Sequence, residues 1–277
     1  MTERRLKATV LVDNIGKDSL KGEWGLSIYL EYERHRILLD CGASALFLEN
    51  ARALGKELKQ VEHVVLSHAH YDHANGLIPF FKYNAGADVW LQESCRENCY
   101  GKWWLFHKYI GIPKGITKKY SGRFTYVSGN TSLLPGVTFI AHSTPGLSEI
   151  GSMEHMYVRE KGRWYADDFS HEQSLVFETQ NGLVIFNSCS HGGADTIIKE
   201  VQKAFPGRKV YALIGGFHLF NKTESYIRDL AERIRETGIA YVYTGHCTGG
   251  RAFRILQEKL KGTVTVQQFS VGLEMEF

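Results

Sequence analysis

Three histidines and one aspartate lie within six positions of the segment His68-Ala69-His70-Tyr71-Asp72-His73, directly after the apolar stretch Val64-Val65-Leu66. Alternate residues of an extended segment point to the same side, so the first two histidines can converge on one point. The aspartate and the last histidine follow where the chain turns into a helix, and they can face a second point. Clustered imidazoles beside an apolar strand need a compensating partner, and imidazole with carboxylate suits zinc, iron or manganese. The segment therefore predicts a metal site at the end of a strand.

Three more histidines also follow strand-like segments, namely His191, His218 and His246. His191 lies in a loop rich in serine, cysteine and glycine, and His246 lies between Gly245 and Cys247, so we predict that both bind metal. His218 can be a ligand, a substrate contact or a hydrogen-bond partner of a ligand. No paired thiolate motif accompanies these histidines, which argues against a closed structural zinc site.

Strand-like and helix-like segments alternate over most of the chain. Strands at 174–178 and 183–186 flank the turn Asn181-Gly182, and a helical segment at 223–237 is stopped by Gly238. Each half begins with a strand hairpin and continues with strand–helix units. This order predicts an α/β fold in which two sheets pack together with helices on the outside.

The chain has 277 residues, of which 43% are hydrophobic, and no low-complexity linker divides it. We therefore predict one domain over residues 1–277. Within it, the segment 93–165 interleaves aromatic residues such as Trp103 and Trp104 with lysines such as Lys102 and Lys108. Such a segment can be a lid or pocket wall that offers cations and aromatic faces to a substrate, an insertion that packs its own aromatics, or a dimer contact.

The formal charge is only +3, from 33 basic and 30 acidic residues, which predicts neither nucleic acid nor an anionic membrane as the main partner. No apolar run approaches the roughly 18–20 residues that span a bilayer. The first residues lead into a strand-like segment instead of a signal-peptide core, so we expect a cytoplasmic location. The five cysteines are an odd number and are expected to be reduced thiols.

The segment 68–73 resembles the His-x-His-x-Asp-His signature of the metallo-β-lactamase fold superfamily, and Asp40 matches the superfamily's early aspartate. Five further segments resemble the branch named for the archaeal 7,8-dihydropterin-6-methyl-4-(β-D-ribofuranosyl)aminobenzene 5′-phosphate synthase. They are Val12-Asp13-Asn14, Gly25-Leu26-Ser27, Cys189-Ser190-His191-Gly192-Gly193, Gly215-Gly216-Phe217-His218-Leu219 and Gly245-His246-Cys247-Thr248-Gly249. The resemblance implies a four-layer αββα sandwich of two mixed sheets.

The resemblance also implies a site for two divalent metal ions. It assigns two groups of ligands, His68 and His70 for the first metal, and Asp72, His73 and His246 for the second. His191 would serve the first metal or bridge the two.

The chain departs from the superfamily pattern at three places. The usual bridging aspartate is replaced by 187–191, Leu147 stands where a histidine commonly follows 144–146, and Trp24 stands where this branch often has a histidine. The third ligand of the first metal and any bridging ligand are therefore open, with Asp168, His142 and His171 as candidates.

The resemblance implies an enzyme in which metal-activated water attacks a phosphoester, lactone or thioester of a small molecule, with Asp72 orienting the water and accepting its proton. Zinc is the expected metal, with iron or manganese as alternatives. The branch implies another reaction, in which a C–N bond joins a pterin to a phosphorylated aminobenzene riboside. Two alternative functions belong to other classes of protein, namely a di-iron redox protein and a non-catalytic binding module. Expected partners are a small molecule, phosphorylated or heterocyclic, and a second copy in a homodimer.

Overall fold

The computed structural model describes residues 4–277, and its strands form two large sheets and one small one. The first large sheet has the order β18-β1-β2-β3-β4-β5-β8. Its strands are Leu6–Val12 (β1), Ser27–Tyr32 (β2), His35–Leu39 (β3), His63–Val65 (β4), Asp88–Gln92 (β5), Phe124–Val127 (β8) and Glu274–Glu276 (β18). Because β3, β4, β5 and β8 pair in parallel whereas β18, β1, β2 and β3 pair antiparallel, this sheet is mixed.

The second large sheet has the order β17-β16-β15-β14-β13-β10-β9 and is also mixed. Its strands are Thr131–Leu134 (β9), Val137–Ala141 (β10), Gln173–Thr179 (β13), Gly182–Phe186 (β14), Val210–Gly215 (β15), Tyr241–Thr244 (β16) and Thr265–Gln268 (β17). The helices are Leu46–Ala53 (α1), Tyr71–Ala74 (α2), Leu77–Tyr83 (α3), Ile116–Lys119 (α4), Leu147–Met153 (α5), Ala194–Ala204 (α6), Glu224–Glu236 (α7) and Gly250–Leu260 (α8).

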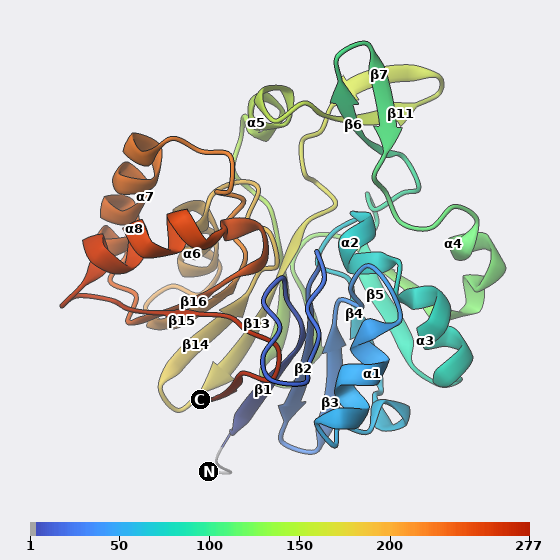
Figure 1. The fold of residues 1–277 in the computed structure, drawn as a ribbon, viewed down its shortest axis with the longest axis horizontal. Coiled ribbons are helices and arrows are strands. Elements are labelled where there is room, and N and C mark those ends of the chain that lie inside the picture. The colour runs from blue at the N-terminus through green and yellow to red at the C-terminus, as the bar shows by residue number, and fades with distance from the viewer. Residues whose placement is uncertain (1–3) are drawn as a thin grey trace.

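Alternation along the strands explains why the two sheets pack face to face. In β14, Val184 and Phe186 point into the core between the sheets, whereas Leu183 and Ile185 pack under α6, α7 and α8. In β3, Leu38 packs instead on the side of α1 and α3. Because successive side chains point to opposite faces, each sheet buries both of its faces. The result is the predicted four-layer αββα sandwich, with α6, α7 and α8 on one outer face and α1 and α3 on the other (Figure 1).

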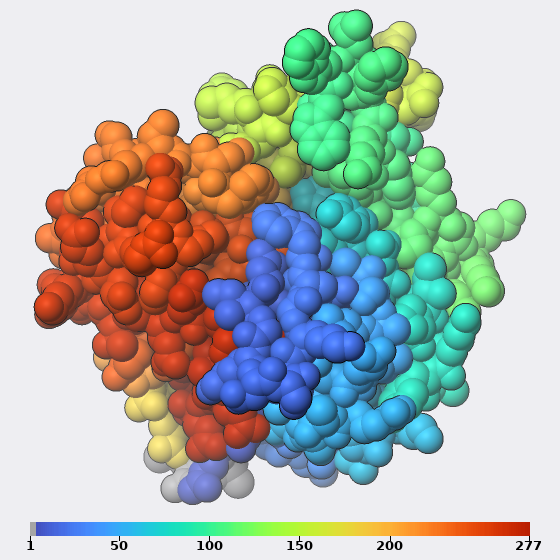
Figure 2. Space-filling model, in the orientation of Figure 1, coloured from blue at the N-terminus to red at the C-terminus, as the bar shows by residue number. Residues whose placement is uncertain are grey.

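The small sheet has the order β12-β11-β6-β7, and we call it the cap sheet. Its strands are Cys99–Trp103 (β6), Phe106–Tyr109 (β7), Met156–Glu160 (β11) and Arg163–Ala166 (β12). The cap sheet and α5 stand above one edge of the large sheets and project beyond the rest of the molecule (Figures 1 and 2). The rest of 93–165 supplies β8, β9 and β10 to the large sheets, so the predicted insertion also contains strands of the sandwich.

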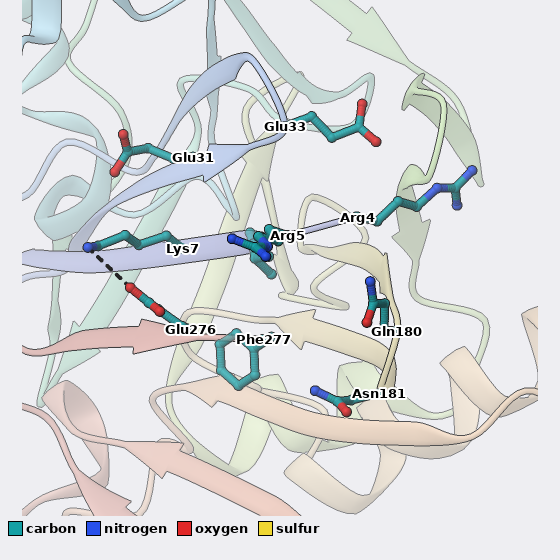
Figure 3. Close-up of a pocket in the computed structure, with 10 residues that line it drawn as sticks. Arg4, Arg5, Lys7, Glu31, Glu33, Gln180, Asn181, Glu276 and Phe277 are labelled. Carbon is teal, nitrogen blue, oxygen red and sulfur yellow. Dashed lines mark ion pairs between the residues drawn. The ribbon is translucent and has the colours of Figure 1, made fainter. Parts of the chain in front are cut away.

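The structure has two pockets of similar size at opposite ends of the sheets. One has about 500 Å³ and lies between the cap sheet and the loops that follow the large-sheet strands. The other has about 530 Å³ and lies beside the chain termini, where Lys7 and Glu276 form a surface ion pair of 3.2 Å (Figure 3). Three of the predicted metal-binding histidines, His70, His191 and His246, line the first pocket and none lines the second. None of the helices between residues 4 and 277 is long and apolar enough to cross a membrane.

Gly76 lies at the start of α3, where the chain leaves the histidine-rich loop and packs against Cys41. A Cβ atom at position 76 would lie 1.9 Å from the carbonyl oxygen of Cys41, closer than atoms can approach. We expect Gly76→Ala to lower the free energy of unfolding by at least about 2 kcal/mol, because the backbone of α3 must shift.

The matched control is Gly86→Ala, because no other described atom lies within 4 Å of a Cβ atom there. Its effect should stay within about 0.5 kcal/mol. Urea unfolding of both variants measures the difference, and equal stabilities would show that the close packing at Gly76 is not needed.

Candidate metal centre

The predicted site residues meet where strands of both large sheets end. Asp40 follows β3, the segment 68–73 follows β4, His191 follows β14, and His246 follows β16. Carboxyl ends of parallel strands lie at one edge of a sheet, and packing two sheets brings two such edges together. The loops therefore meet beneath the cap sheet.

The histidines of the first predicted group lie within contact distance. The ring centroid of His68 lies 4.6 Å from that of His70 and 5.1 Å from that of His191. One nitrogen from each of these three buried rings lies within 4.8 Å of the other two. His191 therefore lies where the open third ligand of the first metal was expected.

Asp72, His73 and His246 form a second, tighter group. Nε2 of His246 lies 3.2 Å from Nε2 of His73 and 3.3 Å from Oδ2 of Asp72. Nε2 of His73 lies 3.7 Å from Oδ2 of Asp72. Donor atoms about 2.0–2.1 Å from a tetrahedral zinc ion lie about 3.3–3.4 Å apart. The spacing of this group therefore fits a single metal ion.

Asp40 orients two of the histidines from behind. Its Oδ2 accepts hydrogen bonds of 2.7 Å from Nδ1 of His73 and from Oγ of Ser67, and Ser67 Oγ in turn accepts from Nδ1 of His68 at 2.7 Å. With Nδ1 of each ring donating, the lone pair lies on Nε2. Metal-binding histidines are usually held this way by their second nitrogen.

His191 and His246 are held in the same manner by other residues. Nδ1 of His191 donates to Oε2 of Glu172 at 2.5 Å, and Nδ1 of His246 donates to Oδ1 of Asn14 at 3.1 Å. Asp13 accepts a bond of 2.7 Å from the backbone N–H of His246. Four imidazoles from three loops thus present Nε2 atoms to a common centre.

The environment keeps the first group of imidazoles neutral. Burial lowers the pKa of His68 and His70 well below the usual range, and neighbouring histidines lower them further. Among the described residues, Nε2 of each ring is buried without a hydrogen-bond partner. An unpartnered buried nitrogen costs free energy unless a cation or another group satisfies it. These residues therefore fit a bound metal.

The second group carries balanced charge. Burial alone would lower the pKa of His73, but the carboxylates of Asp40 and Asp72 raise it to about 9. Burial would raise the pKa of Asp72, but His73 and His246 hold it below its usual range. A metal ion bound here would replace the positive charge that a proton on His73 supplies.

Several residues at the strand ends have backbone angles that non-glycine residues rarely adopt. Asp40, Ser190, His218 and His246 have φ values of 55°, 45°, 48° and 46°. Such conformations persist where the surrounding structure over-determines them, and they concentrate at functional sites. At these four positions the backbone is held in a strained conformation around the candidate metal centre.

The three remaining candidates for the first metal's ligand have other positions. Asp168 is exposed and accepts from the backbone N–H of Ser170, so the structure does not bring it to the cluster. The buried neighbour Asp167 instead bonds Nε2 of His171 at 3.1 Å. His171, whose Nδ1 accepts from the backbone N–H of Ala69, lies beside His70 and forms with His70, Asp167 and Cys99 another buried group that could hold a metal ion.

His142 also lies outside the metal cluster, because it bridges two buried carboxylates. Its Nε2 and Nδ1 lie 3.0 Å from Glu172 and 3.0 Å from Glu200, respectively. Burial alone would lower the pKa of His142, but these carboxylates raise it to about 10. The hydrogen-bonded series His191–Glu172–His142–Glu200 therefore holds the predicted ligand His191 in place. The buried positive charge in this series is the protonated ring of His142.

Sequence reasoning missed Glu172, Asp167 and two cysteines at this centre. Sγ of Cys189 lies 3.3 Å from Nε2 of His73 and 3.5 Å from Sγ of Cys247. Both thiols lie in groups of residues that can hold a metal. The available signal was their place beside His191 and His246 in the loops that carried the resemblance.

His218 lies on the wall of the pocket, with its ring centroid 4.8 Å from that of His191. Trp24 lies beside the second group, 5.1 Å from the ring of His246, and contacts Phe220 edge to face at 5.6 Å. Lys102, Trp103 and Lys108 of the cap sheet line the same pocket. The pocket thus combines a floor of metal ligands with aromatic and cationic walls.

Comparison with known proteins shows what this chain is similar to. The model of the metallo-β-lactamase superfamily matches residues 25–155. A 7,8-dihydropterin-6-methyl-4-(β-D-ribofuranosyl)-aminobenzene-5′-phosphate synthase of Methanocaldococcus jannaschii is 29% identical over 250 residues, which cover 86% of this chain and 85% of that protein. Both the superfamily and the branch that the motifs resembled are therefore found again.

Two crystal structures show the same fold. Tm1679, a metal-dependent hydrolase of the β-lactamase superfamily, superposes with a TM-score of 0.82 at 27% identity and covers 98% of this chain and 99% of its own. Zinc-bound PqqB from Methylobacterium extorquens has a TM-score of 0.59 at 12% identity, and the match covers 97% of this chain and 99% of PqqB. The predicted fold class is confirmed, and the fold family is metal-dependent.

Glu172 gives a direct test of the support behind His191. We expect Glu172→Gln to weaken metal affinity about 10–100-fold, because an amide no longer accepts strongly from Nδ1 of His191. Asp168→Asn is the control, since that side chain is exposed, and it should leave affinity unchanged. Competitive titration with a chelator measures both, and equal affinities would contradict the positioning role of Glu172.

His142 predicts a distinct dependence of stability on pH. Its folded-state pKa of about 10 exceeds the usual histidine value of 6.5, so its contribution is complete below pH 6.5 and is lost as the pH rises towards 10. The pKa values of Glu172 and Glu200 are lowered from 4.5, so their contribution is lost as the pH falls below 4.5.

The variant His142→Gln should therefore be less stable than the wild type by about 3–5 kcal/mol between pH 4.5 and 6.5, because it leaves buried carboxylates uncompensated. The deficit should shrink as the pH rises towards 10. Urea unfolding at several pH values measures it, and a deficit independent of pH would contradict the charged state of His142.

Proposed function

We propose that this chain, a metallo-β-lactamase superfamily member by fold and by sequence, is a metal-dependent hydrolase acting on an ester-type bond of a small molecule. The observation that carries the proposal is the arrangement of His68, His73, His191 and His246, whose Nδ1 atoms all donate to other residues. Their Nε2 atoms are therefore available to cations on the floor of a pocket. The bond is a phosphoester, lactone or thioester.

The ligand set is suited to two divalent transition metal ions. His68, His70 and His191 would hold one, and Asp72, His73 and His246 the other. The imidazole and carboxylate donors favour zinc, iron or manganese, and the nearby thiols of Cys189 and Cys247 make zinc the first choice. When bound, such ions would lower the pKa of a coordinated water from about 15.7 towards about 7 and polarise the substrate.

The side chains of the pocket supply the remaining functions. Asp72 lines the pocket and stays ionised, so its carboxylate can orient an attacking water and accept its proton. Lys102 and Lys108 offer positive charge to a phosphate or carboxylate of the substrate. The ring of Trp24 offers a flat apolar face beside His246.

The same pocket supports a second candidate function, the formation of a C–N bond between a pterin and a phosphorylated aminobenzene riboside. The relative with 29% identity is a synthase by name. The aromatic rings of Trp24, Trp103 and Phe220 suit a flat heterocycle, and the two lysines suit its phosphate. Because similarity of fold does not fix the substrate, the choice between the two reactions rests on assay.

The double variant His68→Ala, His70→Ala tests the role of the metal. It should lose one or both bound metal ions and reduce turnover to background, because two of the proposed ligands of the first ion are removed. His35→Ala is the control, since His35 lies at the start of β3, at the far end of the sheets, and bonds Glu62. Elemental analysis measures the metal, and full turnover by a metal-free double variant would refute the proposal.

A substrate panel decides between the two reactions. Phosphomonoester, phosphodiester, lactone and thioester substrates test for hydrolysis, and a pterin with an aminobenzene riboside phosphate tests for a joined product. We expect hydrolysis of at least one ester class. A joined product without ester hydrolysis would select the synthase reaction, and iron with visible absorbance in the purified protein would favour a redox role.

A further inference from the structure

The turn between β6 and β7 exposes four consecutive large apolar side chains. The exposed fractions are 66% for Trp103, 93% for Trp104, 87% for Leu105 and 77% for Phe106. These residues lie at the free end of the cap sheet, which projects from the sandwich (Figure 2). Soluble proteins rarely expose contiguous apolar groups of this size without a partner.

The choice of residues at this turn is unfavourable for the hairpin itself. Trp103 pairs with Phe106, so Trp104 and Leu105 form a two-residue turn, and Trp104 has a φ of 55°. Asparagine or glycine usually occupies such a position, because bulky residues are strained there. The other two-residue hairpin turns in residues 4–277 contain a polar residue or glycine; they are 33–34, 135–136, 161–162 and 180–181. The stability of the hairpin therefore does not explain why Trp104 and Leu105 occupy this turn.

The cap sheet as a whole is basic. The four strands of the cap sheet and the turns that join them in pairs, residues 99–109 and 156–166, contain five basic residues and one acidic residue. Lys102 and Lys108 lie next to the tip. Arg159, Lys161 and Arg163 lie towards the opposite end of the cap sheet, because β11 runs antiparallel to β6 and begins beside Gly101. This surplus of four exceeds the +3 of the whole chain, so the rest of the molecule is close to neutral. The prediction of no membrane partner used the whole-chain charge, in which this concentration is averaged away.

We propose that the tip of the β6–β7 hairpin is an interfacial anchor that inserts into an anionic lipid bilayer. The apex is apolar, and Lys102 and Lys108 lie just behind it on the two strands. A bilayer surface has the same order, since apolar side chains reach the acyl region while lysines meet phosphate groups. Tryptophan, leucine and phenylalanine opposite basic residues are typical of interfacial segments.

Two other occupants fit the surface less well. In a symmetric pair of copies joined through their tips, the lysines just behind the two tips would approach one another and repel. A polynucleotide needs cations nearest its phosphates, but the apex here is apolar, and Leu105 has no ring on which a base can stack. A bilayer alone matches both the apolar apex and the basic flank.

The anchor and the pocket share residues. Lys102, Trp103 and Lys108 line the pocket above the metal cluster, whereas Trp104 and Leu105 at the apex do not. Insertion of the apex would therefore bring the pocket mouth to the membrane surface, where amphiphilic esters are available. The test of the anchor is independent of the proposed reaction, because the substituted residues Trp104 and Leu105 do not line the pocket.

The test uses Trp104→Asn with Leu105→Gly in the full chain. Asn-Gly is the favoured sequence for a tight hairpin turn, so this variant should fold at least as well as the wild type. Wild-type protein should float with vesicles of phosphatidylcholine and phosphatidylglycerol, and less with phosphatidylcholine alone or at high salt. The variant should partition at least about tenfold more weakly, since two large apolar side chains no longer leave water.

Ile78→Ser is the matched control, because Ile78 is an exposed apolar residue on α3, and it should bind vesicles as the wild type does. Quenching of tryptophan fluorescence by brominated lipid should be strong in the wild type and weaker in Trp104→Phe, which keeps the apolar tip.

Three results would overturn the proposal. The first is a wild type that does not float with anionic vesicles, and the second is a turn variant that floats equally well. The third is a wild type whose tip instead mediates dimerisation or polynucleotide binding, both lost in the turn variant.

Discussion

A buried carboxylate, Asp40, fixes the orientation of the histidine-rich loop. It has no exposed surface, it accepts from the backbone N–H and the hydroxyl of Ser67, and it accepts from Nδ1 of His73. Ser67 passes the same constraint to His68. A buried anion is costly unless it is fully hydrogen-bonded, so these contacts and the carboxylate require one another. Through them, the tautomers of two predicted ligands are decided before any cation arrives.

The second sheet repeats this solution with different residues. Glu172 holds His191 and is itself held by Asn187 and by the charged His142, so the carboxylate stays ionised in the interior. Asn14, from the loop after β1, holds His246. Each large sheet thus provides both ligands and the groups that orient them. The site depends on the packing of the two sheets, because neither contains a complete set.

The cap sheet closes the pocket and has a different character from the sandwich. Glu154, at the end of α5, joins it to the loop after β15 through Asn221, Lys222 and His218. This polar contact crosses the pocket mouth, so the position of the cap is coupled to a residue of the pocket wall. Basic and aromatic residues gather on the cap, whereas the sandwich below it carries little net charge.

Much of this could be predicted from the sequence because it is local. The spacing of residues 68–73 places ligands on two sides of a strand end, and alternation in strands such as β14 predicts two buried faces. These features depend on periods of two residues or on single turns, which the sequence displays directly. The histidines after β14 and β16 were also recognisable, since each follows an apolar strand.

Only the tertiary structure decided which residues stand behind the ligands. Asp167 and Asp168 are adjacent and chemically identical, yet one is buried beside His171 and the other is exposed, because the direction of a loop side chain depends on what packs against it. Glu172 and His142 meet 30 residues apart, and no local pattern encodes such a pair. The sequence by itself determined the candidate ligands and the layers. Packing of distant loops decided their support, and folding of the cap decided where its charge is concentrated.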